Sequence, residues 1–263
     1  MADVAQRWRA ALLAWAIPAE IEAAAERSPW GHPADRFAMR ADTVLAAPSG
    51  ASFERALEAL ASSPGSVLDV GAGVGAGGLP LLPYATSLTA VDPSAEMLAM
   101  LADRAARVSA TPTRTVCGRW PEAAVEVGPH DVVVCHHVFY DVADLAPFVA
   151  ALTRSARRRV VVELPPVHPM SWMAPLWLHF HGIVRPTTPT ADDAVAVVRS
   201  SGVDEVVVDR WERPDPGHSV DIALITRRLC LPESAEPQVA AARAELPAPS
   251  GATVTLSWTG QAR

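Results

Sequence analysis

The feature that most limits the possible folds is a short apolar run that ends in a row of glycines. Residues 67–70 read Val-Leu-Asp-Val, and Gly71, Gly73 and Gly75 follow within the next five positions. Glycine allows positive φ angles and lets a ligand come close to the backbone. A strand that runs through such a loop into a helix leaves the first N–H groups of that helix free for an acceptor-rich ligand. The pattern therefore predicts a nucleotide-type site in an α/β fold.

Apolar runs and helical stretches alternate from this loop to residue 164. The expected strands are 67–70, 87–92, 114–117, 131–135 and 159–164, and the expected helical stretches are 77–84, 94–106 and 144–156. Strands that alternate with helices predict a parallel sheet covered on both faces, because each crossover carries a helix. Ligands of such sheets bind outside the carboxyl ends of the strands. We therefore expect a doubly wound α/β fold with its site on that rim.

The segments on either side of this unit have other patterns. Residues 3–27 show helical spacing of apolar residues that Pro18 interrupts, and short helices are expected at 37–46 and 53–61. Prolines and aromatic residues after residue 164 predict an insertion rather than a plain loop. The sequence thus predicts a helical N-terminal addition (a cap or lid, 1–64) and a ligand-binding domain (65–263). An acceptor-pocket insertion is expected at about 165–190, within an elaborated C-terminal third.

The C-terminal third is expected to mix helices and strands. The expected elements are a helix at 190–201 with Thr190 as its N-cap, a strand at 205–211, a helix at 233–245 and a strand at 253–258. Residues 219–229 are compatible with a strand or a helix, and we favour the helix.

Charge and composition narrow the range of partners. The chain has 263 residues, of which 50% are hydrophobic, and a formal charge of -7. Its only dense basic run, 157–159, precedes an apolar stretch and is typical of a solvated helix end, so nucleic acid is not an expected partner. No apolar stretch reaches the ~20 residues of a membrane span. Three widely spaced cysteines form no zinc or disulfide pattern, and no signal peptide is evident. We expect a cytoplasmic protein with no metal site. The sequence predicts no particular oligomeric state.

The glycine loop alone does not identify its ligand. Residues 71–76 also satisfy the dinucleotide pattern G-x-G-x-x-A. However, Asp69 would repel a dinucleotide phosphate and attract the ammonium and sulfonium groups of S-adenosylmethionine. Asp92 ends the second strand, where a carboxylate can accept hydrogen bonds from ribose hydroxyls of either ligand.

Two pairs of segments carry a family resemblance. Residues 67–75 and 90–98 closely resemble the first two motifs of class I S-adenosylmethionine-dependent methyltransferases, and 116–118 and 131–137 resemble the third and fourth. The resemblance covers roughly residues 60–165. It implies a mostly parallel, seven-stranded sheet, S-adenosyl-L-methionine as cofactor and S-adenosyl-L-homocysteine as product.

The resemblance also implies a set of cofactor contacts. The glycine loop would lie along the methionine and ribose, Asp92 would hold the ribose hydroxyls, and Met97 with Pro93 would pack on the adenine. The family commonly has an acidic residue after the glycine of its third motif, but this chain has Arg119, so backbone groups and the Trp120 ring are expected to take that role. The full set is Asp69, Gly71, Ala72, Gly73, Gly75, Asp92, Pro93, Met97, Gly118, Arg119, Trp120, Cys135 and His136.

Candidates for catalysis and for acceptor binding lie elsewhere on the rim and in the flanks. His136, His137 and Tyr140 follow the fourth strand, where a histidine could act as general base; the alternative is that the pair only holds the loop. The candidates for the acceptor pocket are Trp30, Phe37, Arg40, His168, Trp172 and His181.

The favoured function is methyl transfer to a small molecule, on an oxygen, nitrogen or carbon atom. The alternatives are methylation of a protein side chain, a non-catalytic module that binds the cofactor, and an NAD-dependent oxidoreductase. The chain has no lysine, which excludes a Tyr–Lys proton relay for the last of these.

Overall fold

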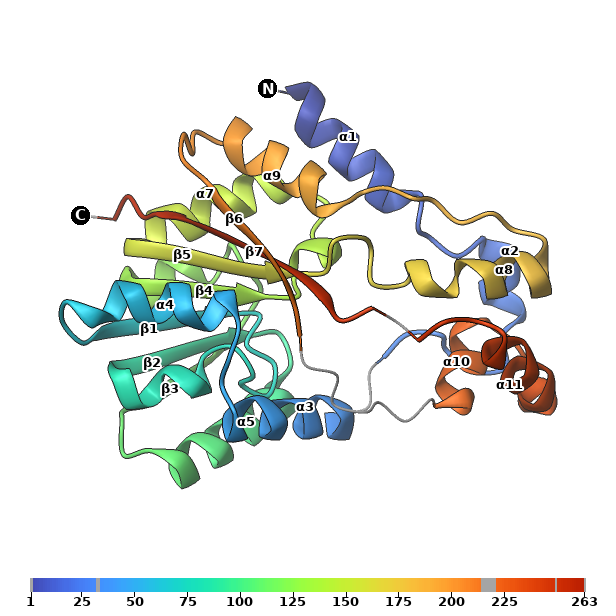
Figure 1. Cartoon of the computed structure of the whole chain (residues 1–263), viewed down its shortest axis with the longest axis horizontal. Coiled ribbons are helices and arrows are strands. Elements are labelled where there is room, and N and C mark those ends of the chain that lie inside the picture. Colours follow the sequence, from blue (N-terminus) through green and yellow to red (C-terminus); the bar gives the residue numbers. More distant parts are fainter. Residues whose placement is uncertain (1, 32–33, 214–220, 249, 263) are drawn as a thin grey trace.

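A parallel sheet with one reversed strand forms the centre of the protein, seen in the computed structural model of Figure 1. The structure describes residues 2–31, 34–213, 221–248 and 250–262. Within them, a seven-stranded sheet has the order β3-β2-β1-β4-β5-β7-β6. The strands are β1 (Gly65–Val70), β2 (Ala85–Asp92), β3 (Thr113–Cys117), β4 (His130–His136), β5 (Ala156–Leu164), β6 (Val207–Glu212) and β7 (Ala252–Thr259).

The strand order contains one reversal that matters for the site. From β1 the chain moves outward to β2 and β3, and then returns to place β4 on the other side of β1. The switch point therefore lies between β1 and β4. Only β7, antiparallel to both β5 and β6, departs from the parallel arrangement among the described strands. The predicted doubly wound, mostly parallel fold is confirmed.

Helices and turns surround this sheet and extend it on one side. They are α1 (Ala2–Leu13), α2 (Ala19–Ala24), α3 (Ala34–Ala46), α4 (Ala51–Ala61), η1 (Leu79–Tyr84), α5 (Ala95–Val108), α6 (Ala124–Val127), η2 (Phe139–Asp141), α7 (Leu145–Ser155), η3 (Ser171–Met173), α8 (Ala174–His181), α9 (Ala191–Ser200), α10 (Ile222–Arg228), η4 (Glu233–Ala235) and α11 (Glu236–Ala244).

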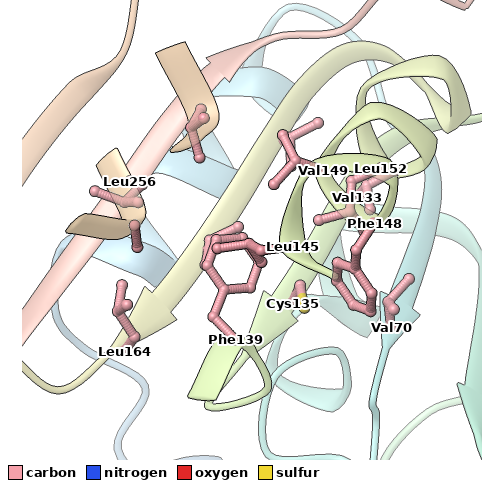
Figure 2. Close-up of a cluster of buried hydrophobic side chains, with 14 of the residues drawn as sticks. Val70, Val133, Cys135, Phe139, Leu145, Phe148, Val149, Leu152, Leu164 and Leu256 are labelled. Carbon is pink, nitrogen blue, oxygen red and sulfur yellow. The ribbon is translucent and has the colours of Figure 1, made fainter. Parts of the chain in front are cut away.

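Alternate residues of each strand pack into two apolar layers, as the two-residue period of a strand requires. Val133 of β4 points into a layer shared with α1, α7 and α9. Its neighbours Val132 and Val134 point into the opposite layer, shared with α4, η1 and α5. Figure 2 shows the first layer, which contains Val133 of β4 and Phe148 of α7. Both faces of the central strands are thereby buried.

A third apolar cluster lies beside the sheet. It is formed by α2, α8, α10 and α11, which gather at the right of Figure 1, and we call these four helices the helical lobe. Met173, Trp177, Ile225 and Val239 are buried at its centre. The lobe joins segments that are far apart in the sequence. The expected division at residues 64 and 65 falls at the start of β1, and it stays a prediction.

Most predicted elements are confirmed, with small shifts at their ends. Thr190 caps α9 by accepting the N–H of Asp193, and residues 222–228 are a helix, as favoured. The helical stretch near 77–84 is a 3-10 helix, and Pro83 inside it lacks the N–H donor that a longer α-helix would use. Among the described residues, no helix is both long and apolar enough to cross a membrane.

Candidate active site

The end of β2 holds the glycine loop in place. The Asp92 carboxylate is buried and accepts the N–H of Gly73 at 2.9 Å and the N–H of Ser94 at 2.8 Å. The loop also donates from Gly71 and Ala72 to the carbonyl of Val91. Each Asp92 oxygen has accepted one hydrogen bond from protein and keeps a further acceptor position. A rigid carboxylate with spare acceptor capacity therefore stands at the carboxyl end of β2, beside the glycine loop.

Two glycines of the loop have different surroundings. Gly71 has a φ of +70°, and a Cβ built on it would lie 2.3 Å from Val138 Cγ2, so that position is closed by packing. Gly73 has a φ of +52°, and the nearest atom to its Cβ would be Met97 Sδ at 3.8 Å. Gly73 thus leaves room above the backbone beside Met97.

Asp69 lies beneath the loop as a buried carboxyl group. It is 1% exposed and accepts the N–H of Gly78 at 2.7 Å. Burial raises the pKa of Asp69 to about 7, although the hydrogen bond from Gly78 lowers it in part. A Cβ on Gly77 would lie 3.2 Å from both Asp69 Oδ1 and His136 Nδ1, so these two side chains flank Gly77.

The third-motif residues lie along the ends of β2 and β3. Gly118 donates its N–H to the carbonyl of Asp92 at 3.1 Å. Trp120 packs against the core, and its buried Nε1 has no hydrogen-bond partner in the described part of the chain. Arg119 and Pro93 are exposed. The backbone groups of Asp92 and Gly118 are therefore joined here, and the Trp120 indole follows two residues later in the sequence.

The residues after β4 have separate environments. His136 is held by burial in the neutral form, since burial lowers its pKa, and its Nε2 has no partner among the described residues. Cys135 is fully buried in the core, which raises its pKa. Tyr140 donates its hydroxyl to the carbonyl of Pro165 at 3.1 Å and stacks on Trp8, so its polar end is already engaged.

His137 belongs to a charged cluster at the end of β5, which we call the Glu163 cluster: Glu163, His137, Arg40, Arg213 and Ser52. Glu163 Oε1 lies 2.8 Å from His137 Nε2 and accepts a hydrogen bond from Arg213, while Oε2 accepts the hydroxyl hydrogen of Ser52. Arg40 reaches His137 Nε2 from α3. Burial, followed by the charge of Arg40, lowers the pKa of His137 to about 4, so this imidazole is neutral at pH 7.

Sequence reasoning missed Glu163, Arg213 and Ser52. Glu163 carried a usable signal, because it is a charged residue near the end of a strand that reaches the expected rim. Ser52 and Arg213 carried none, since they lie 111 and 50 positions from Glu163 and meet it only through the fold.

Of the six candidates for the acceptor pocket, Arg40 contacts a residue that follows β4, His137. Trp30 is 52% exposed and donates to Glu22, and Phe37 is partly buried on α3. His168 stacks on Trp15 with ring centroids 4.0 Å apart. Trp172 of η3 packs against the helical lobe, and His181 lies within it, where His181 Nε2 is 2.7 Å from the carbonyl of Leu229.

A protein-family model and several solved structures both support the fold. A family model described as "Methyltransferase domain" matches residues 68–162. No curated protein matches the sequence. The magnesium protoporphyrin IX methyltransferase ChlM of Synechocystis PCC 6803, solved with bound SAH, is 16% identical with a TM-score of 0.52, and the match covers 86% of this chain and 84% of that one.

Two further solved structures have the same architecture. The YcgJ protein of Bacillus subtilis is 16% identical with a TM-score of 0.52, covering 79% of this chain and 100% of that one. A TehB-like SAM-dependent methyltransferase of Corynebacterium glutamicum is 14% identical with a TM-score of 0.51, covering 87% and 96%. At these identities the likeness shows the shared fold.

Proposed function

Because the chain carries a class I S-adenosylmethionine-dependent methyltransferase domain, we propose that it transfers a methyl group from S-adenosylmethionine to a small-molecule acceptor. The observation that carries this proposal is the Asp92 carboxylate, which is fixed at the end of β2 beside an open Gly73. A dinucleotide would bring its phosphates toward Asp69, whose carboxyl group repels them in its ionised form.

The residues present fit the cofactor. Asp92 has acceptor capacity for two ribose hydroxyls, and the space over Gly73 is bounded by the Met97 thioether rather than by backbone. The buried, unpartnered Nε1 of Trp120 offers a donor near the third motif. When bound, the cofactor supplies an electrophilic methyl group. The chain then has to align an acceptor with it, and alignment alone accounts for much of the acceleration in such reactions.

The side chains that cover the end of β5 favour a small acceptor over a protein side chain. Side chains from α3, α4 and the segment after β6 converge on Glu163, whose side chain is only 6% exposed. A protein substrate would need an open groove at this place.

His136 is the base that we propose for an acceptor with a hydroxyl or amine hydrogen. A Cβ on Gly77 would lie 3.2 Å from both His136 Nδ1 and Asp69 Oδ1, and in the tautomer that carries its proton on Nδ1 the other nitrogen, Nε2, is the acceptor. Nε2 has no competing partner among the described residues, unlike the engaged Nε2 of His137 and the engaged hydroxyl of Tyr140.

Calorimetric titration with S-adenosylmethionine, S-adenosylhomocysteine and NAD in parallel tests the cofactor. We expect the two adenosyl ligands to bind and NAD to give no heat. Transfer of a labelled methyl group to a panel of small acceptors then tests the reaction. Binding of NAD alone would contradict the proposal, and transfer only to intact proteins would redirect it to a macromolecular acceptor.

A further inference from the structure

Two guanidinium groups converge on one carboxylate in the Glu163 cluster. Arg213 forms an ion pair with Glu163 Oε1, and Arg40 lies 3.9 Å from the same oxygen. The Nη2 atoms of both arginines also contact His137 Nε2, at 3.1 Å in the case of Arg213. Within the described residues, these arginines form ion pairs with no other carboxylate than Glu163. Since His137 is neutral, two positive charges share one negative charge.

Glu163 cannot satisfy both arginines by itself. Its Oε1 is shared among His137 and the two guanidinium groups, and its Oε2 is taken by the Ser52 hydroxyl. Burial, followed by the charge of Arg213, lowers the pKa of Arg40 to about 10, and Glu163 only partly offsets this. An unneutralised, partly buried cation is unfavourable until an anion or water compensates for the lost solvation.

The cluster lies beside the cofactor loop rather than on it. Glu163 is the last residue but one of β5 and His137 follows β4, whereas the glycine loop follows β1, and the strand order is β1-β4-β5. At about 4.8 Å between neighbouring strands, the end of β5 is roughly 10 Å from that of β1. A group bound at the cluster would thus lie next to a ligand of the glycine loop.

We propose that Arg40 and Arg213 bind a carboxylate of the methyl acceptor, which makes the substrate a small organic acid. This inference rests on the proposed function. The surplus of one positive charge matches a singly charged carboxylate better than a doubly charged phosphate ester. Two guanidinium forks around one point also suit a planar group with two equivalent oxygens.

The experiment uses benzoate as a carboxylate probe and benzamide as its neutral counterpart. Binding is followed by ligand-observed NMR on the full chain, with and without saturating S-adenosylhomocysteine. We expect benzoate to bind and benzamide to be silent. Arg40→Gln and Arg213→Gln should each weaken benzoate about tenfold or more, the effect of losing one charge-assisted hydrogen bond.

Arg158→Gln is the matched control. Arg158 has a side-chain exposure of 32%, close to the 34% of Arg40, and pairs one to one with Asp131 at the other end of the sheet. This variant should bind benzoate like the wild type. Arg40→Lys keeps the charge and should restore part of the affinity. Near-ultraviolet circular dichroism of each variant separates lost binding from lost folding.

Four results would overturn the proposal: equal binding of benzoate and benzamide, undiminished benzoate binding in both arginine variants, tighter binding of inorganic phosphate than of benzoate, or a loss of S-adenosylhomocysteine affinity in both variants without any benzoate binding. The last result would assign the arginines to the cofactor's own carboxylate. If the wild type binds benzoate but neither adenosyl ligand, the proposed function fails while the anion site stands.

Discussion

The Asp92 carboxylate accepts the Gly73 N–H at 2.9 Å, and this one hydrogen bond ties the end of β2 to the loop that follows β1. The two strands are neighbours in the sheet, so the contact spans the crossover between them. The same carboxylate accepts the Ser94 N–H at the start of α5. Asp92 therefore sets the loop's position before any ligand is present.

Asp92→Ala should weaken S-adenosylhomocysteine binding by about 1.5–3 kcal/mol, because hydrogen bonds to a charged acceptor are lost. Titration calorimetry measures the change. Asp131→Ala is the control: Asp131 also accepts a backbone N–H, from Ser66 at 2.8 Å, but at the amino end of β4. That variant should lower stability and leave the dissociation constant unchanged. An unchanged constant for Asp92→Ala would remove Asp92 from the site.

Gly71→Ala should destabilise the fold by about 2–4 kcal/mol, as left-handed backbone strain adds to overpacking against Val138. Gly182 has a similar φ of +67°, but nothing lies within 4 Å of its Cβ position. Gly182→Ala should therefore show the strain alone, about 1–2 kcal/mol. Urea unfolding of both variants provides the comparison. If both variants lose the same free energy of unfolding, Val138 moves aside at no cost when a Cβ is added to Gly71.

The sequence was sufficient to predict the sheet, because each strand and helix from residue 67 to 164 has its own local period. It also indicated Asp69 and Asp92, since both end strands at the expected rim. The helical lobe was not predictable in the same way. Trp177 lies far in the sequence from Ile225 and Val239, and each helix alone is only an apolar stretch without a visible partner.

The N-terminal segment shows a related limit. Its helices were predictable from their spacing, but their docking was not. Trp8 of α1 donates its indole N–H to the carbonyl of Val142 at 2.9 Å, which fixes α1 on the α7 side of the sheet. On α3, Arg40 instead reaches His137. Both contacts span about a hundred residues or more, and nothing in the local pattern of either helix indicates them.

Asp69→Asn should change how stability depends on pH. Burial raises the pKa of Asp69 to about 7, above its value in the unfolded chain, so the protonated form is favoured by folding. The stability that this group contributes is complete below about pH 4 and is lost as pH rises through 7. Between pH 4 and pH 7 the free energy of unfolding of the variant should therefore rise relative to that of the wild type, by at most about 1.4 kcal/mol per pH unit. Above pH 7 the difference should level off.

Urea unfolding at pH 5, 6, 7 and 8 measures this difference, with Asp131→Asn as control. Burial of Asp131 is outweighed by hydrogen bonds from Ser66 and by the charge of Arg158, so its pKa is lowered. The difference between that variant and the wild type should stay constant across the same range. A flat difference for Asp69→Asn as well would mean that Asp69 is ionised in the folded protein throughout.

Glu163→Gln should destabilise the protein by about 3–5 kcal/mol, because it leaves two partly buried guanidinium groups without their shared counter-charge. Asp209→Asn is the matched control. Asp209 accepts two hydrogen bonds from Arg55, at 2.8 and 3.0 Å, but its side chain is 28% exposed. Asp209→Asn should therefore lower the free energy of unfolding by only about 0–1 kcal/mol.

The pH dependence of the Glu163 effect separates charge from packing. Burial raises the pKa of Glu163, but the hydrogen bond with His137 and the charge of Arg213 outweigh it and hold the pKa well below its usual range. The stability from this carboxylate is thus present above about pH 4.3 and is lost as pH falls through the folded pKa. The gap between wild type and Glu163→Gln should stay constant from pH 5 to 8 and narrow below pH 4. If Glu163→Gln is as mild as Asp209→Asn at pH 7, the two arginines do not depend on Glu163 for neutralisation, and water or another group satisfies them instead.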